Sequence, residues 1–248
     1  MKIRWFQQSG WKKMLLLLGA GFLIGLAALP SVWPKPSQTT WFMPLSGRVI
    51  VVDAGHGGPD GGAVSRTGLV EKTVTLNIAM YLRDYLQEAG ALVIMTRESD
   101  TDLAPPDARG LRSRKAEDLM RRIRLIKEKQ ADALISIHLN SIPSPKWSGA
   151  QTFYNPVREE NMKLASFIQA ELIRNLQNTN RLPKQKGDIY LLKQSPVPTA
   201  LVEVGFLSNP KESELLGQPD YQKKLAASIY AGILRYYAGN EPPPLQQP

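Results

Sequence analysis

The chain contains no cysteine and only two histidines among its 248 residues. The absence of cysteine excludes disulfide scaffolds, thiolate zinc fingers and cysteine nucleophiles. The sequence also lacks the Walker A, H-E-x-x-H and G-x-S-x-G motifs, and Asp60 stands where the dinucleotide-binding fingerprint requires its third glycine. Imidazole chemistry is therefore confined to His56 and His138.

Acidic residues are fewer than basic ones: the chain has 22 Asp and Glu against 31 Lys and Arg, an excess of nine positive charges. This excess is compatible with an anionic polymer or surface, but it is too small to indicate nucleic acid, and we expect no nucleic-acid partner. Many bases lie in residues 109–129. We interpret this stretch as a solvated helix face, with attraction to an anionic wall polymer or lipid as the functional alternative.

One long apolar run, residues 14–29, follows a basic start and ends at Pro30. Sixteen residues are typical of a signal-peptide core and are at the short end for a membrane-spanning helix. A buried core helix is the alternative, but the run has no amphipathic side. We expect residues 1–30 to be a signal peptide or a membrane anchor. The basic flank predicts that the chain after Pro30 is exported and lies outside the cytoplasm.

The rest of the chain divides into a linker at 31–46, one domain at 47–239 and a flexible tail at 240–248. Within the domain, short apolar runs alternate with helical patterns. We expect strands at 48–53, 91–95, 133–137, 150–154, 189–192 and 199–204, and helices at 71–89, 112–130, 158–178, 219–237 and from Pro210 onwards. This alternation predicts a single α/β domain with a largely parallel sheet covered by helices.

Both histidines follow predicted strands. His56 lies three residues after Asp53 in a glycine-rich loop, and His138 directly follows the strand at 133–137. Ligands bind at the carboxyl ends of parallel strands, and neutral imidazole is a common zinc ligand, so the pair predicts a metal site. A lone histidine at a strand end is more often structural, but two such histidines favour the metal site.

A catalytic zinc ion requires three protein ligands and an open position. Since the chain has no cysteine and no third histidine, the third ligand must be a carboxylate. Glu71, at the start of the first helix, is the preferred candidate, and Asp53 and Asp60 are alternatives. We expect Asp53 instead to accept the ring N–H of a ligating histidine. Glu203 ends another apolar run, where it can move a proton between water and a leaving amine.

Four motifs resemble, in order and spacing, the zinc-dependent N-acetylmuramoyl-L-alanine amidases. They are DAGHGGPDGGA (53–63), Glu71 followed by KTVTLNIA, SIHLNS (136–141) and VEVGFLSNP (202–210). The resemblance spans 48–238 and implies a mixed, mostly parallel six-stranded sheet flanked by helices. It also implies Zn²⁺ held by His56, Glu71 and His138, with Glu203 as the catalytic carboxylate. Many relatives have alanine at the position of Ser141, and this difference does not involve any of the proposed ligands.

Within that family, residues 85–105, 113–119, 137–154 and 228–237 resemble the spore-cortex amidases of endospore-forming bacteria. That likeness implies hydrolysis of the amide between N-acetylmuramic acid and L-alanine, as a step towards muramic-δ-lactam, in the intermembrane space of the forespore. The implied substrate is glycan with peptide stems. Because no wall-binding repeat is present, we expect targeting to come from the N-terminal segment, from the substrate or from a partner protein, and an activator protein is a candidate partner.

Two other functions stay open from the sequence. One is a different zinc peptidoglycan hydrolase, either a peptidase or a deacetylase, and the other is a non-catalytic wall-binding protein. The sequence singles out no substrate-contact residue.

Overall fold

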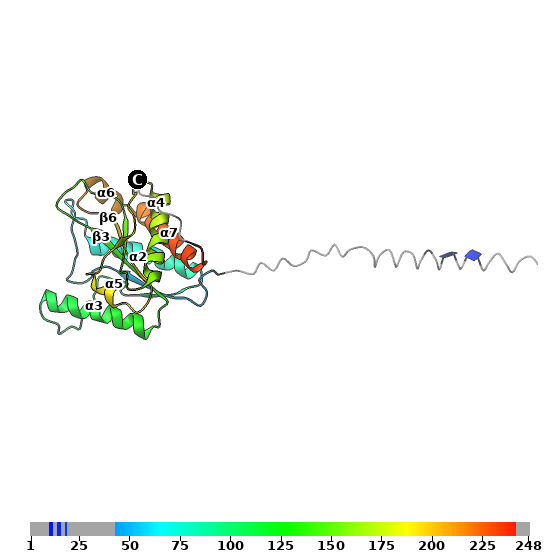
Figure 1. The fold of residues 1–248 in the computed structure, drawn as a ribbon, viewed down its shortest axis with the longest axis horizontal. Coiled ribbons are helices and arrows are strands. Elements are labelled where there is room, and N and C mark those ends of the chain that lie inside the picture. Colours follow the sequence, from blue (N-terminus) through cyan, green and yellow to red (C-terminus); the bar gives the residue numbers. More distant parts are fainter. Residues whose placement is uncertain (1–9, 12–13, 16–17, 19–42, 242–248) are drawn as a thin grey trace, which may run out of the picture. The chain divides into compact units, whose positions relative to one another are not determined.

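The computed structural model describes residues 10–11, 14–15, 18 and 43–241 (Figure 1). Most of the expected signal or anchor segment, most of the linker and most of the tail lie outside the described residues. Among the residues that are described, no helix is long and apolar enough to cross a membrane. The chain divides into two compact units, Met1–Phe42 and Met43–Pro248. The second unit contains the sheet and every candidate site residue.

Six strands form a single sheet in the order β2-β1-β3-β6-β4-β5. They are β1 (Val49–Ala54), β2 (Leu92–Met95), β3 (Ala133–Asn140), β4 (Gln151–Tyr154), β5 (Lys184–Gln185) and β6 (Thr199–Phe206). The strands β2, β1, β3 and β6 are parallel, and β4 runs antiparallel to β6 and parallel to β5. The expected α/β class with a mixed, mostly parallel six-stranded sheet is confirmed.

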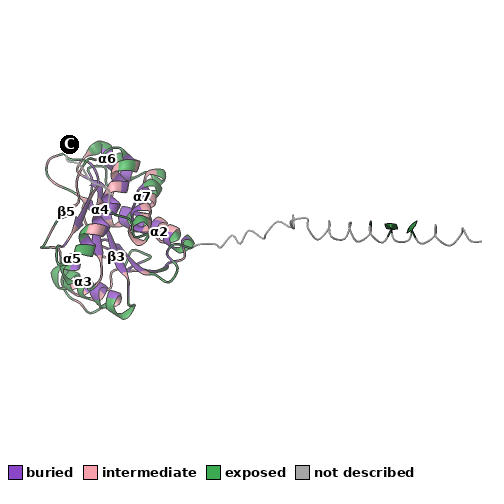
Figure 2. Ribbon diagram, turned by 45° about the vertical axis from the view of Figure 1, so that its right-hand side comes forward, coloured by how far each residue is buried: buried purple, intermediate pink, exposed green. Residues whose placement is uncertain are grey.

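The helices lie on both faces of this sheet (Figures 1 and 2). They are α2 (Glu71–Glu88), α3 (Leu111–Glu128), α4 (Glu159–Leu176), α5 (Tyr190–Gln194), α6 (Pro210–Leu216) and α7 (Pro219–Tyr237). Residues of α2, α4 and α7 share one apolar core with one face of the sheet. Residues of α3 and α5 share a second, smaller cluster with the other face.

The strand expected at 189–192 is wrong, because Ile189 is the N-cap of the short helix α5 and the helix begins at Tyr190. Leu191 and Leu192 are adjacent and both buried. They join two different clusters on the α3 and α5 side of the sheet. A four-residue apolar run fits a strand or a buried helix equally well. The fifth strand is instead the exposed pair Lys184–Gln185, which carries no apolar signal.

Side chains alternate between the two faces of the sheet. One face is apolar throughout the central strands, and the other carries polar side chains near the carboxyl end of β3. Ile135 and Ile137 of β3 point into the main core, whereas His138 points to the opposite face. In register across the sheet, His138 lies beside Glu203 of β6, and Glu203 lies beside Gln151 of β4. A row of polar side chains therefore crosses the sheet at the carboxyl end of β3.

A buried ion pair joins α3 to the sheet next to this row. Arg122 Nη1 lies 2.6 Å from Asp53 Oδ1, and both side chains are almost fully buried. Arg122 also donates to Asp118, and Asp53 accepts from the hydroxyls of Thr96 and Ser136. Burial raises the pKa of Asp53, but the charges of Arg122 and His138 and the hydrogen bonds from Ser136 and Arg122 together outweigh it, and the pKa lies below its usual value.

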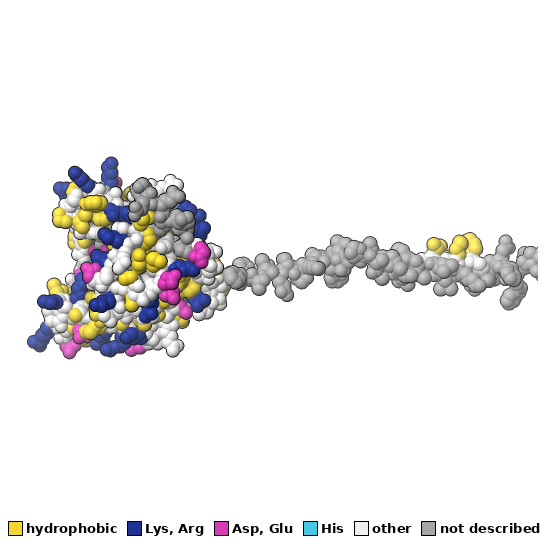
Figure 3. All heavy atoms as spheres, viewed as in Figure 1, with side chains coloured by type: hydrophobic (Ala, Val, Ile, Leu, Met, Phe, Trp, Pro, Cys, Tyr) yellow, Lys and Arg dark blue, Asp and Glu magenta, His cyan; other side chains and the backbone are white. Residues whose placement is uncertain are grey.

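The basic stretch at 109–129 is not one solvated face. Lys and Arg side chains lie over α3 along the lower edge of Figure 3. However, Arg122 is buried, Arg114 Nε lies 2.6 Å from Asp102, and Lys115 Nζ lies 2.9 Å from Asp60. The interpretation as a uniformly solvated face is therefore wrong for Arg122 and incomplete for the two residues paired with acids.

Replacing Arg122 by methionine is expected to lower the free energy of unfolding by about 3–5 kcal/mol, because the charge of Asp53 stays buried without its cation. Urea denaturation measures this loss. Arg124→Met, at an exposed position of the same helix, is the control and is expected to cost less than about 0.5 kcal/mol. Equal losses for the two variants would contradict a stabilising role for the buried pair.

Candidate metal centre

His56, Glu71 and His138 meet from three separate elements. His56 follows β1, Glu71 is the first residue of α2, and His138 lies in β3. His56 Nε2 lies 3.0 Å from Glu71 Oε1, and His138 Nδ1 lies 3.2 Å from the same oxygen. The two imidazole rings are 5.0 Å apart, edge to face. One ligand atom from each residue lies within 4.8 Å of the other two.

This donor set fits a zinc ion. Two imidazoles and one carboxylate are a known catalytic set, and bonds of about 2.0–2.1 Å in a tetrahedron separate ligand atoms by roughly 3.3 Å. The nitrogen–oxygen separations in the cluster are close to that value. The side chains of His56 and His138 stay 14% and 20% exposed, so the cluster is accessible from solvent.

Backbone amides fix the carboxylate of Glu71. Oε2 accepts from the amide of Ala63 at 2.8 Å, and Oε1 accepts from the amide of Leu139 at 2.9 Å. Burial raises the pKa of Glu71, but hydrogen bonds with the two histidines outweigh it and hold the pKa well below its usual range. A Cβ at Gly62, where φ is 67°, would lie 2.6 Å from Oε2, so the loop needs glycine there.

Two buried arginines hold the loop that carries His56. His56 itself has a left-handed backbone with φ of 63°, which is strained for a residue with a side chain. Arg122 Nη2 donates to the carbonyl of His56 at 2.7 Å. Arg97 donates to the carbonyls of Ala54 and Gly55 at 3.0 and 2.9 Å. These hydrogen bonds offset the backbone strain and fix the position of the main chain from which the His56 side chain projects.

The two alternative carboxylates occupy different places. Asp53 contacts Arg122 and hydroxyl groups and no imidazole, so the expectation that Asp53 orients a ligating histidine is wrong. Asp60 Oδ2 instead lies 3.0 Å from His56 Nδ1, the ring nitrogen that does not face Glu71. Burial raises the pKa of Asp60, but Lys115 and His56 lower it to about 2. The carboxylate is ionised, so its charge acts on the ring, but the contact does not have hydrogen-bond geometry, and His56 Nδ1 has no hydrogen-bond partner among the described residues.

Glu203 lies beside the cluster, next to His138 in the sheet register. Its Oε2 is buried and has no hydrogen-bond partner among the described residues. Burial raises the pKa of Glu203, against the opposing charge of His138. Buried polar atoms are normally satisfied, so an unsatisfied carboxylate oxygen beside a donor cluster indicates a group that interacts with a ligand.

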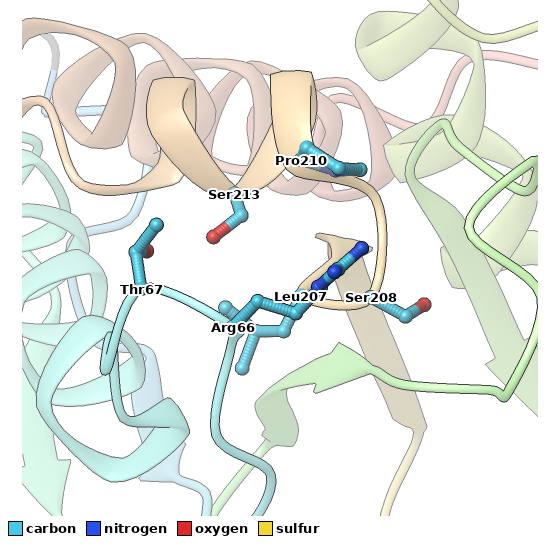
Figure 4. Close-up of a pocket in the computed structure, with 6 residues that line it drawn as sticks. All are labelled: Arg66, Thr67, Leu207, Ser208, Pro210 and Ser213. Carbon is cyan, nitrogen blue, oxygen red and sulfur yellow. The ribbon is translucent and has the colours of Figure 1, made fainter.

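A separate hollow of about 240 Å³ opens between the 66–67 loop and α6. Ser213 points into it from α6, and Thr67 lies on the facing loop (Figure 4). None of the three cluster residues lines it. This hollow is therefore not part of the metal centre.

Residues 50–235 match the family model of N-acetylmuramoyl-L-alanine amidases. The chain belongs to this family. It is therefore an N-acetylmuramoyl-L-alanine amidase, a hydrolase of peptidoglycan, and the expected family and enzyme class are confirmed.

Relatives and solved structures agree over most of this amidase. The germination-specific N-acetylmuramoyl-L-alanine amidase of Bacillus subtilis (strain 168) is 60% identical over 208 residues, which cover 84% of this chain and 87% of that protein. The CwlD amidase from Clostridioides difficile, solved in complex with the GerS lipoprotein, has a TM-score of 0.76 at 40% identity. That match covers 78% of this chain and all of that one.

The catalytic domain of CwlV from Bacillus (Paenibacillus) polymyxa has a TM-score of 0.67 at 30% identity, over 78% of this chain and 99% of that domain. The family model, which matches residues 50–235, includes all three residues of the cluster.

The cluster is expected to bind one zinc ion, and His138→Ala is expected to lose most of it, because two protein ligands hold zinc far less tightly than three. Metal analysis of the purified, folded variant measures the stoichiometry. A full equivalent of zinc in His138→Ala would contradict the ligand assignment.

Asp60→Asn is expected to weaken zinc binding by about 10–100-fold without abolishing it, because the carboxylate orients a ligand and is not one itself. Competition with a chelator measures the affinity. Asp107→Asn, at an exposed position, is the control. Unchanged zinc affinity in Asp60→Asn would show that His56 is positioned without Asp60.

Proposed function

We propose that this amidase binds Zn²⁺ through His56, Glu71 and His138 and uses Glu203 to move the proton in hydrolysis. The bond cut is the amide between the lactyl group of N-acetylmuramic acid and L-alanine. The observation that carries this proposal is the buried, unsatisfied Oε2 of Glu203 next to the His-Glu-His cluster.

Zinc, when bound, supplies Lewis acidity that polarises the amide carbonyl and lowers the pKa of water towards about 7. Glu71, ionised and fixed by two backbone amides, holds its oxygen towards both imidazoles. Glu203 takes the proton from the attacking water at Oε2. As the C–N bond breaks, Glu203 gives that proton to the nitrogen of L-alanine.

Burial raises the pKa of Glu203, and the charge of a bound zinc ion would oppose that rise. A carboxylate whose pKa moves from its ordinary value towards neutral pH is a stronger base, and its acid is still able to protonate an amine that leaves. Because Glu203 lies beside His138 in the sheet register, one residue makes both transfers in this mechanism. No second acid is needed in this mechanism.

We propose further that the substrate is the peptidoglycan of the spore cortex. The 60% identical relative of Bacillus subtilis is named germination-specific. Removing stem peptides from muramic acid would prepare the glycan for conversion to muramic-δ-lactam by another enzyme. We place the domain outside the cytoplasm, with residues 1–30 as its signal or anchor. Because the CwlD amidase of Clostridioides difficile was solved with the GerS lipoprotein, an accessory protein is a candidate partner here.

Glu203→Gln is expected to keep its zinc while hydrolysis falls by about 10²–10⁴-fold, the scale of a general acid–base group. Glutamine preserves the size of the side chain but cannot accept the proton of water at neutral pH. Glu71→Gln, the matched variant at the proposed ligand, is expected to lose zinc affinity and activity together. Metal content and release of peptides from denuded cortex fragments are measured for both.

The products distinguish this reaction from the two alternatives. New N-terminal L-alanine indicates the amidase, and new free amino sugar would indicate a deacetylase. Full activity of Glu203→Gln would contradict its role in proton transfer. Loss of zinc from Glu203→Gln but not from Glu71→Gln would show that the two roles are exchanged.

A further inference from the structure

A basic groove lies next to the polar row. This hollow of about 400 Å³ is lined by Trp147, Gln151, Arg181, Lys184, Lys186 and Phe206, together with three further residues at its wall. Its lining contains three cations and no acid. We call it the basic groove.

Gln151 connects the basic groove to the candidate catalytic carboxylate. It lies opposite Glu203 in the register of β4 and β6, so the two side chains point to the same face of the sheet. On its other side, Gln151 Oε1 accepts from Arg181 Nη1 at 3.4 Å. The positive charge of Lys186 is among those that lower the pKa of Glu203 against its burial. The groove therefore begins beside Glu203.

Arg181 is held rigidly in this groove. Its guanidinium lies 5.4 Å from the ring centre of Trp147 and 5.1 Å from that of Phe206. Its Nε donates to the carbonyl of Ser148 at 3.0 Å. A cation fixed in this way loses little conformational entropy when it binds a carboxylate.

The three cations of the groove have no close ion-pair partner in the part of the chain that the structure describes, although the charge of Lys186 acts on Glu203 and that of Arg181 on Glu212. Among the described residues, Arg181, Lys184 and Lys186 form no ion pair, and neither lysine amine donates a hydrogen bond. By contrast, Lys72 and Lys115, near the metal centre, each pair with an aspartate. Uncompensated cations around one hollow favour an anionic ligand.

We propose that the basic groove binds the anionic stem peptide, the half of the substrate that leaves with L-alanine. This inference rests on the proposed amidase reaction. In the substrate, the lactyl carboxyl of muramic acid is part of the amide, so the glycan half is neutral at the bond that is cut. The peptide half carries its carboxylates, and charge complementarity assigns it to the groove.

The test uses the full chain loaded with zinc and two muramoyl peptides that differ only in charge. One has free carboxylates on its stem, and in the other the same carboxylates are amidated. The double variant Lys184→Gln with Lys186→Gln is expected to raise KM for the free-carboxylate substrate by about tenfold, the effect of losing one hydrogen bond to a charged group. KM for the amidated substrate is expected to change less than about twofold.

Raising the salt concentration adds a second readout, because screening weakens the attraction of charges. Salt is expected to raise KM of the unmodified chain for the free-carboxylate substrate only. The double variant Lys129→Gln with Lys224→Gln removes an equal charge from exposed positions outside the groove and is expected to change neither KM. An equal rise for both substrates, or no rise for either, in the double variant would overturn the proposal.

A binding experiment keeps this result separate from the amidase reaction. The released stem peptide and its amidated form are titrated into Glu203→Gln by calorimetry, with and without the two lysine substitutions. Charge-selective binding that disappears with the lysines supports the groove even if the chain hydrolyses neither substrate, which would instead overturn the proposed reaction. Equal binding of both peptides, or no binding, overturns the groove.

Discussion

The guanidinium of Arg122 holds together three parts of this amidase. It neutralises the buried Asp53 of β1, donates to Asp118 of its own helix, and donates to the carbonyl of His56. A buried charge pair is not favourable in itself, since both ions lose their hydration. Once the pair is formed, however, removing either ion leaves the charge of the other buried without a partner, which is strongly destabilising. The packing of α3 and the position of the first imidazole therefore depend on the same group.

The period of two along a β-strand places the chemistry on the face that α3 and α5 cover. On the opposite face, alternate residues of β3 and β6 pack into the main core: Ile135, Ile137, Leu139, Ala200, Val202 and Val204. Because residues directly across a sheet point the same way, the register aligns His138, Glu203 and Gln151 in one row. A slip of one residue in either pairing would turn one of these side chains into the apolar core. The strand register thus fixes the site as firmly as it fixes the core.

Apolar runs and their ends predicted the parallel strands and the two histidines of the cluster, since buried strands and strand-end histidines leave a local signal in the sequence. Glu71 is only the preferred one of three carboxylates, and the resemblance to the amidases singles it out. The signal fails where position depends on partners far away in the chain. Strand β5, Lys184–Gln185, has no apolar residue and exists only through pairing with β4. Asp53 and Asp60 both lie close to His56 in sequence. Asp53 is nevertheless bound to Arg122, which lies 69 residues further along the chain, and a local pattern does not reveal this pairing. The basic groove is assembled by the same long-range pairing.

The unsatisfied oxygen of Glu203 shows where this amidase departs from what stability alone would select. A buried acceptor without a donor costs about 1–3 kcal/mol, and a glutamine or an apolar residue would avoid the charge. The left-handed backbone at His56 adds strain of a similar order. Both costs fall within one small region, and the surrounding core and the two buried arginines hold that region in place. The unsatisfied carboxylate and the strained backbone occur together at the candidate site. A bound ligand can supply the interaction that the carboxylate oxygen lacks in the folded chain.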